Sequence, residues 1–423
     1  MKTILPPRRS RFIDMLDSGM RLARRAGLAK RPRLERSALM EQAREYTGLE
    51  DFGDPWFEQP FERLLEAVNG EARLNAAGEW AAEKQFEKVL HDRLWARQWF
   101  ARHPEILTRP MPHPVIVVGP MRSGTTRMHR LLSSDHRFTH LRSFETISPV
   151  PRPDFTWGGH DSRTVLAARI MRVARLANPR TLTIHPTGPY EPEEELGLLV
   201  NSFWGMKHSA QWWVPSYTRW CEGHDATGAY EQMARLLRLA GWSQQASSLR
   251  PWILKTPQHM MDIPALLRVF PDARFIFTHR DPLSVVGSAA SLAWNQTIIY
   301  SDHADPRRIG AEWLRNTRLQ VERMLAGRND IPQSRCIDVH YEEMEGDWRG
   351  AMRRVYDFIG FEIEPALPAM EHYQLRTRGL KQHPHRYSLE EFGLTPGQVE
   401  EALGGYAKAY GITPDCVHSA AGG

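Results

Sequence analysis

One short segment of the chain combines glycines, hydroxyls and an arginine in a spacing that suits phosphate binding. It runs from Pro114 to Ser134 and reads PVIVVGPMRSGTTRMHRLLSS. Gly119 and Gly124 bracket four residues, as in a Walker A loop, but Thr125 stands where the Walker lysine would be. Such a loop is poorly suited to a γ-phosphate with Mg²⁺. It could still cradle a 5′-phosphate, with Arg122 as a bidentate partner. The alternative is a turn that only opens a packed helix.

The residues on either side of this loop predict a strand and a helix. Val115 to Val118 is a short β-branched run, typical of a strand buried on both faces. Met128, Leu131 and Leu132 then recur at helical spacing. The start of such a helix directs several backbone N–H groups and the positive end of its dipole at one spot. We therefore expect an anion to bind where this helix begins.

Three further apolar segments predict strands that alternate with helices. Such an order implies a parallel sheet flanked by helices, whose ligands bind at the carboxyl ends of the strands. Lys255 and Arg280 fall at such ends. The three segments are Trp252–Lys255, Arg274–Thr278 and Cys336–Tyr341.

The residues after the third predicted strand indicate a second anion site. Asp281 as N-cap and Pro282 at the first helical position predict a helix start. Ser288 lies two turns further on, on the same face as Asp281. Arg280 and Ser288 can thus converge on a single anion.

We predict an α/β fold in which a P-loop-type parallel sheet is flanked by helices and preceded by a helical N-terminal region. The predicted divisions are 1–110 for the helical region with a basic arm, 111–345 for the core, and 346–423 for a segment that closes the nucleotide site. The 423 residues, 41% hydrophobic and 25% charged, are typical of a large globular protein.

Cysteine and charge usage narrow the class of protein. The three cysteines (Cys221, Cys336 and Cys416) are far apart and form no metal-binding spacing, which favours a reducing compartment and no metal. No stretch suits a signal peptide or a membrane span, so a cytoplasmic protein is expected. The net charge is +5, but residues 1–36 hold eleven Lys or Arg against three Asp or Glu. The charge therefore indicates no nucleic-acid partner.

The loop PMRSGTT resembles the 5′-phosphosulfate loop of sulfotransferases that use 3′-phosphoadenosine-5′-phosphosulfate (PAPS). The resemblance is to the broad bacterial branch related to the tyrosylprotein sulfotransferases. It implies PAPS as donor substrate, with no metal. It assigns the 3′-phosphate to Arg280 and Ser288, and places Tyr341 near the nucleotide. It assigns the 5′-phosphosulfate end to Arg122, Ser123, Gly124, Thr125 and Thr126. A C-terminal stretch from His383 to Leu389 is similar to one that closes over the cofactor, where Lys381 and Arg386 could add positive charge.

Transfer of a sulfuryl group needs charge stabilisation and a base. Lys255 and Arg122 are the expected cations for the charge that builds on the leaving phosphate. For the base, the resemblance to tyrosylprotein sulfotransferases favours Glu145, in Ser143–Thr146. His259 is the alternative, because cytosolic relatives use a histidine soon after a lysine-threonine pair.

The acceptor is open beyond a hydroxyl on an apolar small molecule or lipid. A stretch rich in aromatics could form the wall of an acceptor site, or it could be core; it holds Phe203, Trp204, Trp212, Trp213, Tyr217 and Trp220. Residues 1–36 could lie on an anionic membrane surface or be a packed terminal helix. The alternatives to a sulfotransferase are a P-loop kinase and an inactive nucleotide-binding protein. The oligomeric state is open.

Overall fold

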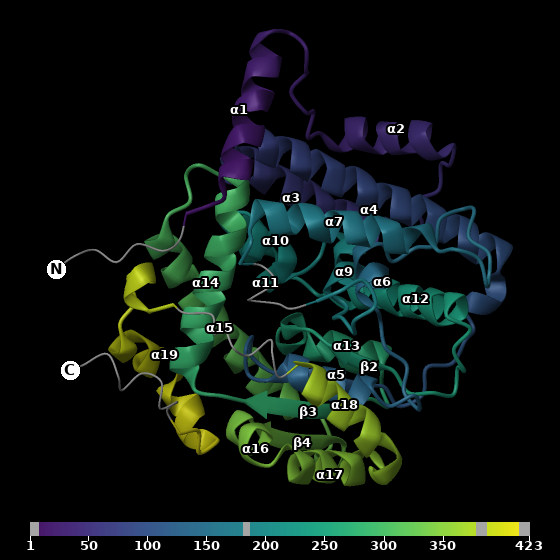
Figure 1. Cartoon of the computed structure of the whole chain (residues 1–423), viewed down its shortest axis with the longest axis vertical. Coiled ribbons are helices and arrows are strands. Elements are labelled where there is room, and N and C mark those ends of the chain that lie inside the picture. The colour runs from purple at the N-terminus through teal and green to yellow at the C-terminus, as the bar shows by residue number, and fades with distance from the viewer. Residues whose placement is uncertain (1–7, 181–186, 378–386, 414–423) are drawn as a thin grey trace.

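The computed structural model describes residues 8–180, 187–377 and 387–413. These residues form one sheet of four parallel strands in the order β2–β1–β3–β4, low in the view of Figure 1. The strands are β1 Val115–Val118, β2 Ile253–Lys255, β3 Arg274–His279 and β4 Cys336–His340. The predicted parallel sheet is confirmed, with strand ends within one residue of those expected.

The sheet is buried on both faces, as its apolar strands require. On one face Val115, Val117 and Ile276 pack with α5 Thr125–Ser133 and α17 Trp348–Ile359. On the other, Ile116 and Phe275 join a larger core with the helices that lie between residues 227 and 328. Adjacent residues of a strand point to opposite faces, so β1 contributes to both cores. Because all four strands are parallel, their carboxyl ends lie at one edge of the sheet.

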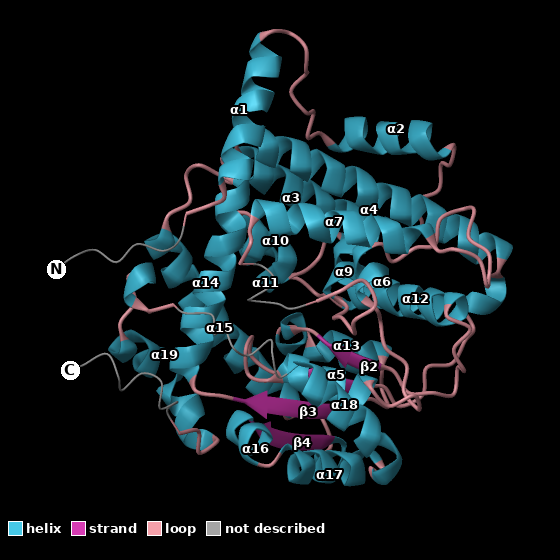
Figure 2. Cartoon of the chain, viewed as in Figure 1, coloured by secondary structure: helices cyan, strands magenta, loops and turns pink. Residues whose placement is uncertain are grey.

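Helices make up most of the rest of the described chain (Figure 2). The N-terminal region holds α1 Arg11–Arg25, α2 Arg36–Thr47, α3 Glu58–Gly70 and α4 Ala76–Arg102. Between β1 and β2 lie α5, α6 Ser143–Ile147, α7 Ser162–Ala177, α9 Leu196–Leu199, α10 Met206–Gln211, α11 Pro215–Glu222 and α12 Thr227–Ser243.

The remaining α-helices of the described chain follow β2 in sequence. They are α13 Ile263–Val269, α14 Pro282–Tyr300, α15 Pro306–Arg328, α16 Tyr341–Gly346, α17, α18 Leu367–Thr377 and α19 Pro396–Ala409. α14 begins as its sequence predicts: Asp281 accepts a hydrogen bond from the Leu283 amide, and Pro282 is the first helical residue.

Part of the aromatic-rich stretch belongs to the core of the N-terminal region. The Phe203 ring stacks on Phe61 with 4.0 Å between centroids, and Trp212 meets Phe86 edge-on at 5.5 Å. Trp212 is 1% exposed. Of the two interpretations of this stretch, the core interpretation therefore holds for Phe203 and Trp212. Large aromatics are usually buried because they remove the most apolar surface from water.

Candidate active site

The phosphate loop is fixed to the neighbouring strand by its own hydroxyl. Ser123 Oγ lies 2.7 Å from the Pro120 carbonyl oxygen and 2.7 Å from Thr278 Oγ1 at the end of β3. Gly119 sits against the same threonine, because a Cβ there would lie 2.1 Å from Thr278 Oγ1. A side chain at position 119 would collide with Thr278, so the glycine there allows β1 and β3 to approach each other at their carboxyl ends.

Two left-handed residues turn the loop into the helix that follows. Gly124, the N-cap of α5, has a φ of +89°, and Arg122 has a φ of +69°. Glycine tolerates this conformation, whereas an arginine there is strained, by about 1–3 kcal/mol. A Cβ on Gly124 would also lie 3.2 Å from the Tyr341 ring. The loop is therefore a close-fitting cradle that ends at the N-terminus of α5, where backbone N–H groups are available to an anion.

Lys255, at the end of β2, supplies a cation next to the loop. Its Nζ donates to Thr126 Oγ1 at 3.3 Å and lies 3.3 Å from Glu194 Oε2. The residue is 3% exposed, so its charge acts in surroundings that screen it little. The lysine missing from the loop is thus replaced in space by one from the adjacent strand.

Arg280 joins the end of β3 to the loop. Its Nη1 donates to the Arg122 carbonyl oxygen at 2.8 Å, and its guanidinium lies 3.8 Å from the centroid of the Tyr341 ring. The Arg122 residue reaches solvent, but the protein around its guanidinium and the nearby Arg280 charge lower its pKa. Arg280 therefore contacts both Arg122 and the Tyr341 ring, and the three residues form one cluster with two positive charges.

Ser288 carries a buried hydroxyl that has no hydrogen-bond partner among the described residues. The residue is 2% exposed on α14, two turns from Asp281. An unpaired buried hydroxyl is costly unless a ligand completes it. Tyr387 covers the same part of α14, since its hydroxyl donates to the Ser284 carbonyl oxygen at 2.8 Å. Lys381 and Arg386 lie outside the described residues.

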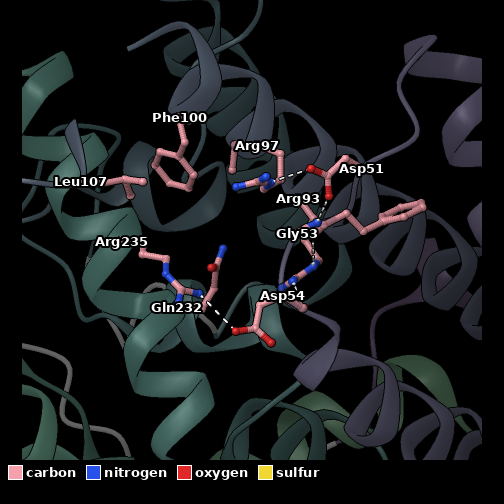
Figure 3. A pocket seen from close by; sticks show the side chains of 11 residues that line it. Asp51, Gly53, Asp54, Arg93, Arg97, Phe100, Leu107, Gln232 and Arg235 are labelled. Atoms are coloured by element: carbon pink, nitrogen blue, oxygen red, sulfur yellow. Dashed lines mark hydrogen bonds and ion pairs between the residues drawn. The ribbon is translucent and has the colours of Figure 1, made fainter. Parts of the chain in front are cut away.

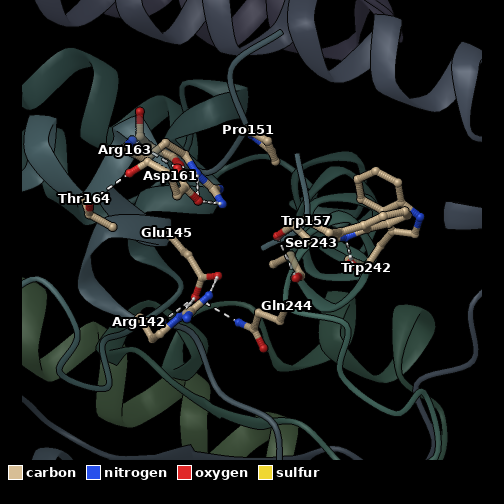
Figure 4. A network of polar contacts seen from close by, with 12 residues as sticks. Arg142, Glu145, Pro151, Trp157, Asp161, Arg163, Thr164, Trp242, Ser243 and Gln244 are labelled. Atoms are coloured by element: carbon tan, nitrogen blue, oxygen red, sulfur yellow. Dashed lines mark hydrogen bonds and ion pairs between the residues drawn. The ribbon is translucent and has the colours of Figure 1, made fainter. Parts of the chain in front are cut away.

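Glu145 is enclosed by other side chains (Figure 4). The carboxylate is fully buried and accepts hydrogen bonds from the backbone, Nε and Nη2 of Arg142, at 2.6 to 3.0 Å. A fourth comes from Gln244 Nε2 at 2.9 Å. The bond from Gln244, the residue after α12, joins α6 to the end of that helix. None of the four bonds reaches the phosphate loop. A carboxylate so engaged must give up contacts before it can accept a proton.

His259 is also buried, and it lies beside Glu195, which bonds to the backbone of Lys255. Its Nδ1 is 2.9 Å from the Tyr230 hydroxyl, and its Nε2 is 3.4 Å from Glu195 Oε2. Glu195 in turn accepts the Lys255 backbone N–H at 2.8 Å. Glu195 thus bonds to the end of β2, whereas the buried His259 Nε2 beside it has no hydrogen-bond partner among the described residues.

Sequence reasoning missed the roles of Glu194 and Glu195. The run of three glutamates at 193–195 is visible in the sequence, but nothing local connects it to a strand sixty residues later. Only the folded chain brings Glu194 to the ammonium of Lys255 and Glu195 to its backbone.

A separate cavity of about 360 Å³ lies between the 51–54 loop, α4 and α12 (Figure 3). Arg93 is buried there and donates to three backbone carbonyl oxygens, those of Phe52, Asp54 and Asn201. Burial lowers the pKa of Arg93 to about 9. No residue of the phosphate loop lines this cavity, so it is not part of the anion site.

Comparison with known proteins gives consistent results. Over 341 residues, the chain is 25% identical to omega-hydroxy-beta-dihydromenaquinone-9 sulfotransferase Stf3 of Mycobacterium bovis, covering 75% of this chain and 80% of the relative. The sulfotransferase STF1 of Mycobacterium tuberculosis is 29% identical with a TM-score of 0.77, covering 88% of this chain and 98% of that one. STF9 of Mycobacterium avium is 25% identical with a TM-score of 0.80, covering 91% and 99%.

The model of the sulfotransferase family matches residues 114–365, which is more than half of the chain and spans the phosphate loop, Lys255, Arg280 and Ser288. The resemblance read from the loop is thereby confirmed, and so is the predicted enzyme class. The protein belongs to the sulfotransferase family.

Proposed function

We propose that the protein transfers a sulfuryl group from PAPS to a hydroxyl of an apolar acceptor. The observation that carries the choice of donor is the buried, unpartnered hydroxyl of Ser288, close in sequence to Arg280 and on the helix that starts at the nucleotide end of the sheet. A nucleotide with both 5′- and 3′-phosphates would occupy the cradle and this second site together.

The phosphate loop and Lys255 would hold the reacting end of the donor. Residues 122–126 would bind the 5′-phosphosulfate through backbone N–H groups, the hydroxyls and the Arg122 guanidinium. Lys255 Nζ, already 3.3 Å from Thr126 Oγ1, would stabilise the charge that develops on the bridging oxygen. Positioning and charge stabilisation dominate such in-line transfers.

The other end of the nucleotide would lie on α14. Arg280 and the Ser288 hydroxyl would bind the 3′-phosphate, and the Tyr341 ring would pack near the nucleotide. Lys381 and Arg386 remain candidates for further contacts there. The 3.8 Å stacking of Arg280 on Tyr341 keeps the guanidinium oriented before the ligand arrives.

The acceptor hydroxyl needs a proton acceptor, and two carboxylates compete for this role. Glu145 is the one predicted from sequence, but its four hydrogen bonds give it a structural role already. Glu194 is favoured by a specific observation: its carboxylate lies 3.3 Å from Lys255 Nζ, and its side chain is 21% exposed. We therefore place Glu194 ahead of Glu145, and both ahead of His259.

The proposed acceptor is a hydroxylated lipid or another apolar small molecule. Its support is the similarity to Stf3, whose name gives an omega-hydroxylated menaquinone as substrate. A lipid acceptor would also give a reason for peripheral membrane contact. Residues 1–36 were the predicted contact, but arginines of this segment pair with acidic residues of the body: Arg9 with Asp302 at 2.6 Å, and Arg24 with Glu79 at 2.5 Å.

The test has two parts. Thermal stabilisation by 3′,5′-ADP should exceed that by 5′-AMP, because only the former fills both anion sites. Incubation with PAPS and a panel of hydroxylated lipids should yield a product heavier by one SO₃. Stabilisation by ATP with Mg²⁺ in preference to 3′,5′-ADP would instead support a kinase. Tight 3′,5′-ADP binding without transfer to any acceptor would support an inactive nucleotide-binding protein.

A further inference from the structure

Helix α7 exposes apolar residues on the surface of the molecule. Val165, Val173 and Leu176 are 39%, 54% and 49% exposed. In Figure 1 the helix is drawn in front of α3 and α4, on the side toward the viewer. Val165 and Leu176 are eleven residues apart, three helical turns, so they lie on the same face. Several exposed apolar side chains on one helix face mark an interaction site more often than an isolated leucine does.

The same face is strongly basic. α7 contains four arginines and no acidic residue. Arg163 is buried and paired with Asp161 at 2.7 Å. Arg169 and Arg172 lie between Val165 and Leu176 in the same stripe; both are exposed, as is Arg175. Within the described residues these three form no ion pair, whereas Arg9 and Arg24 of the N-terminal segment are paired with Asp302 and Glu79.

The helix is firmly held from its inner side, so the outer face is not a loose segment in search of packing. Arg163 lies 5.1 Å from the Phe144 ring of α6, and Ala167 is fully buried. At the other end Asn178 Nδ2 donates to the Asn295 carbonyl oxygen of α14 at 2.9 Å. α7 is thus attached by its inner side to the two helices that carry Glu145 and Ser288.

We propose that the outer face of α7 docks the enzyme on an anionic lipid bilayer. Arginines interleaved with valine and leucine suit the interface, where guanidinium groups meet lipid phosphates and the apolar side chains enter the acyl boundary. Contact would be peripheral, since within the described residues no helix is long and apolar enough to cross a membrane. The proposal rests on the proposed function only for its purpose: a docked enzyme would meet a lipid acceptor where that acceptor resides.

The experiment is co-sedimentation of the full chain with vesicles. Wild type should pellet with vesicles that contain phosphatidylglycerol and much less with pure phosphatidylcholine. The double variants Val173→Asp/Leu176→Asp and Arg169→Gln/Arg172→Gln should each weaken the anionic-vesicle binding at least about tenfold. The matched controls are Leu249→Asp, an exposed leucine in the loop before β2, and Arg353→Gln on α17. Both controls should bind as wild type does.

Independent readouts separate this proposal from the assignment of the site. All four variants should keep wild-type stabilisation by 3′,5′-ADP, which confirms that they fold. Failure of the wild type to transfer sulfate would count against the proposed function alone, because vesicle binding is measured without turnover. Vesicle binding that is absent in wild type or unchanged in both double variants would overturn the docking proposal. If wild type does not bind vesicles, and the double variants instead lose self-association or DNA binding, the docking proposal is likewise overturned.

Discussion

Lys255 Nζ lies 3.3 Å from Thr126 Oγ1, although 129 residues separate the two in sequence. The lysine next to the phosphate loop thus comes from the adjacent strand β2 and not from the loop itself. A Walker lysine binds the β- and γ-phosphates from within its own loop, whereas Lys255 reaches the loop from the neighbouring strand. This arrangement suits transfer of a substituent from the 5′-phosphate.

Replacing Lys255 should therefore impair chemistry more than binding. We expect Lys255→Met to lower kcat by about 10²–10³-fold, because a preorganised charge at the leaving oxygen is lost. Affinity for 3′,5′-ADP, which lacks the sulfuryl group, should change much less. Single-turnover rates and calorimetric titration measure the two quantities. Lys255→Arg is the control and should retain part of the rate; an unchanged kcat in Lys255→Met would remove this residue from the mechanism.

The second anion site can be tested by nucleotide discrimination. Arg280→Ala should weaken 3′,5′-ADP binding by about 10–150-fold, since a hydrogen bond to a charged group contributes about 1.5–3 kcal/mol. Binding of 5′-AMP should stay near wild type. Ser288→Ala should show the same selectivity with a smaller loss and should not destabilise the free protein, because its hydroxyl has no partner there. Equal losses for both nucleotides would contradict the assignment.

The two carboxylates can be separated by measuring rate and stability together. Glu194→Gln should reduce kcat by about 10²–10⁴-fold, as loss of a general base does, with little change in unfolding free energy. Glu145→Gln should mainly destabilise, by about 1.5–3 kcal/mol, because the charge-assisted hydrogen bonds from Arg142 would be lost. His259→Ala should affect rate less than Glu194→Gln does. The reverse pattern, a stable but inactive Glu145→Gln, would restore Glu145 as the base.

Trp212 should report on the core and not on the acceptor. Trp212→Ala should cost about 3–5 kcal/mol of unfolding free energy, because it removes a fully buried ring that packs on Phe86. The acceptor KM of whatever folded protein remains should be unchanged. A clear rise in KM without destabilisation would revive the acceptor-wall interpretation. Denaturant titration and steady-state kinetics are sufficient to decide.

Sequence reasoning succeeded where the signal is local. The β-branched run of β1, the glycines of the loop and the Asp281-Pro282 start of α14 each follow from the chemistry of adjacent residues, and the structure places them as expected. It did not foresee contacts that depend on distant partners. The hydrogen bond from Gln244 to Glu145 and the approach of Glu194 to Lys255 arise only when segments far apart in the chain pack together.

The position of Lys255 on β2, outside the phosphate loop, has a consequence for how the protein folds. Because β2 and the loop are separated by most of the helical insertion between β1 and β2, the complete anion site exists only after a long-range parallel pairing has formed. Pairings of this kind are slow to close. Nucleotide affinity should thus appear late in refolding, after most of the circular dichroism signal of the helices has recovered. A ligand present during refolding would select chains whose sheet is correctly assembled.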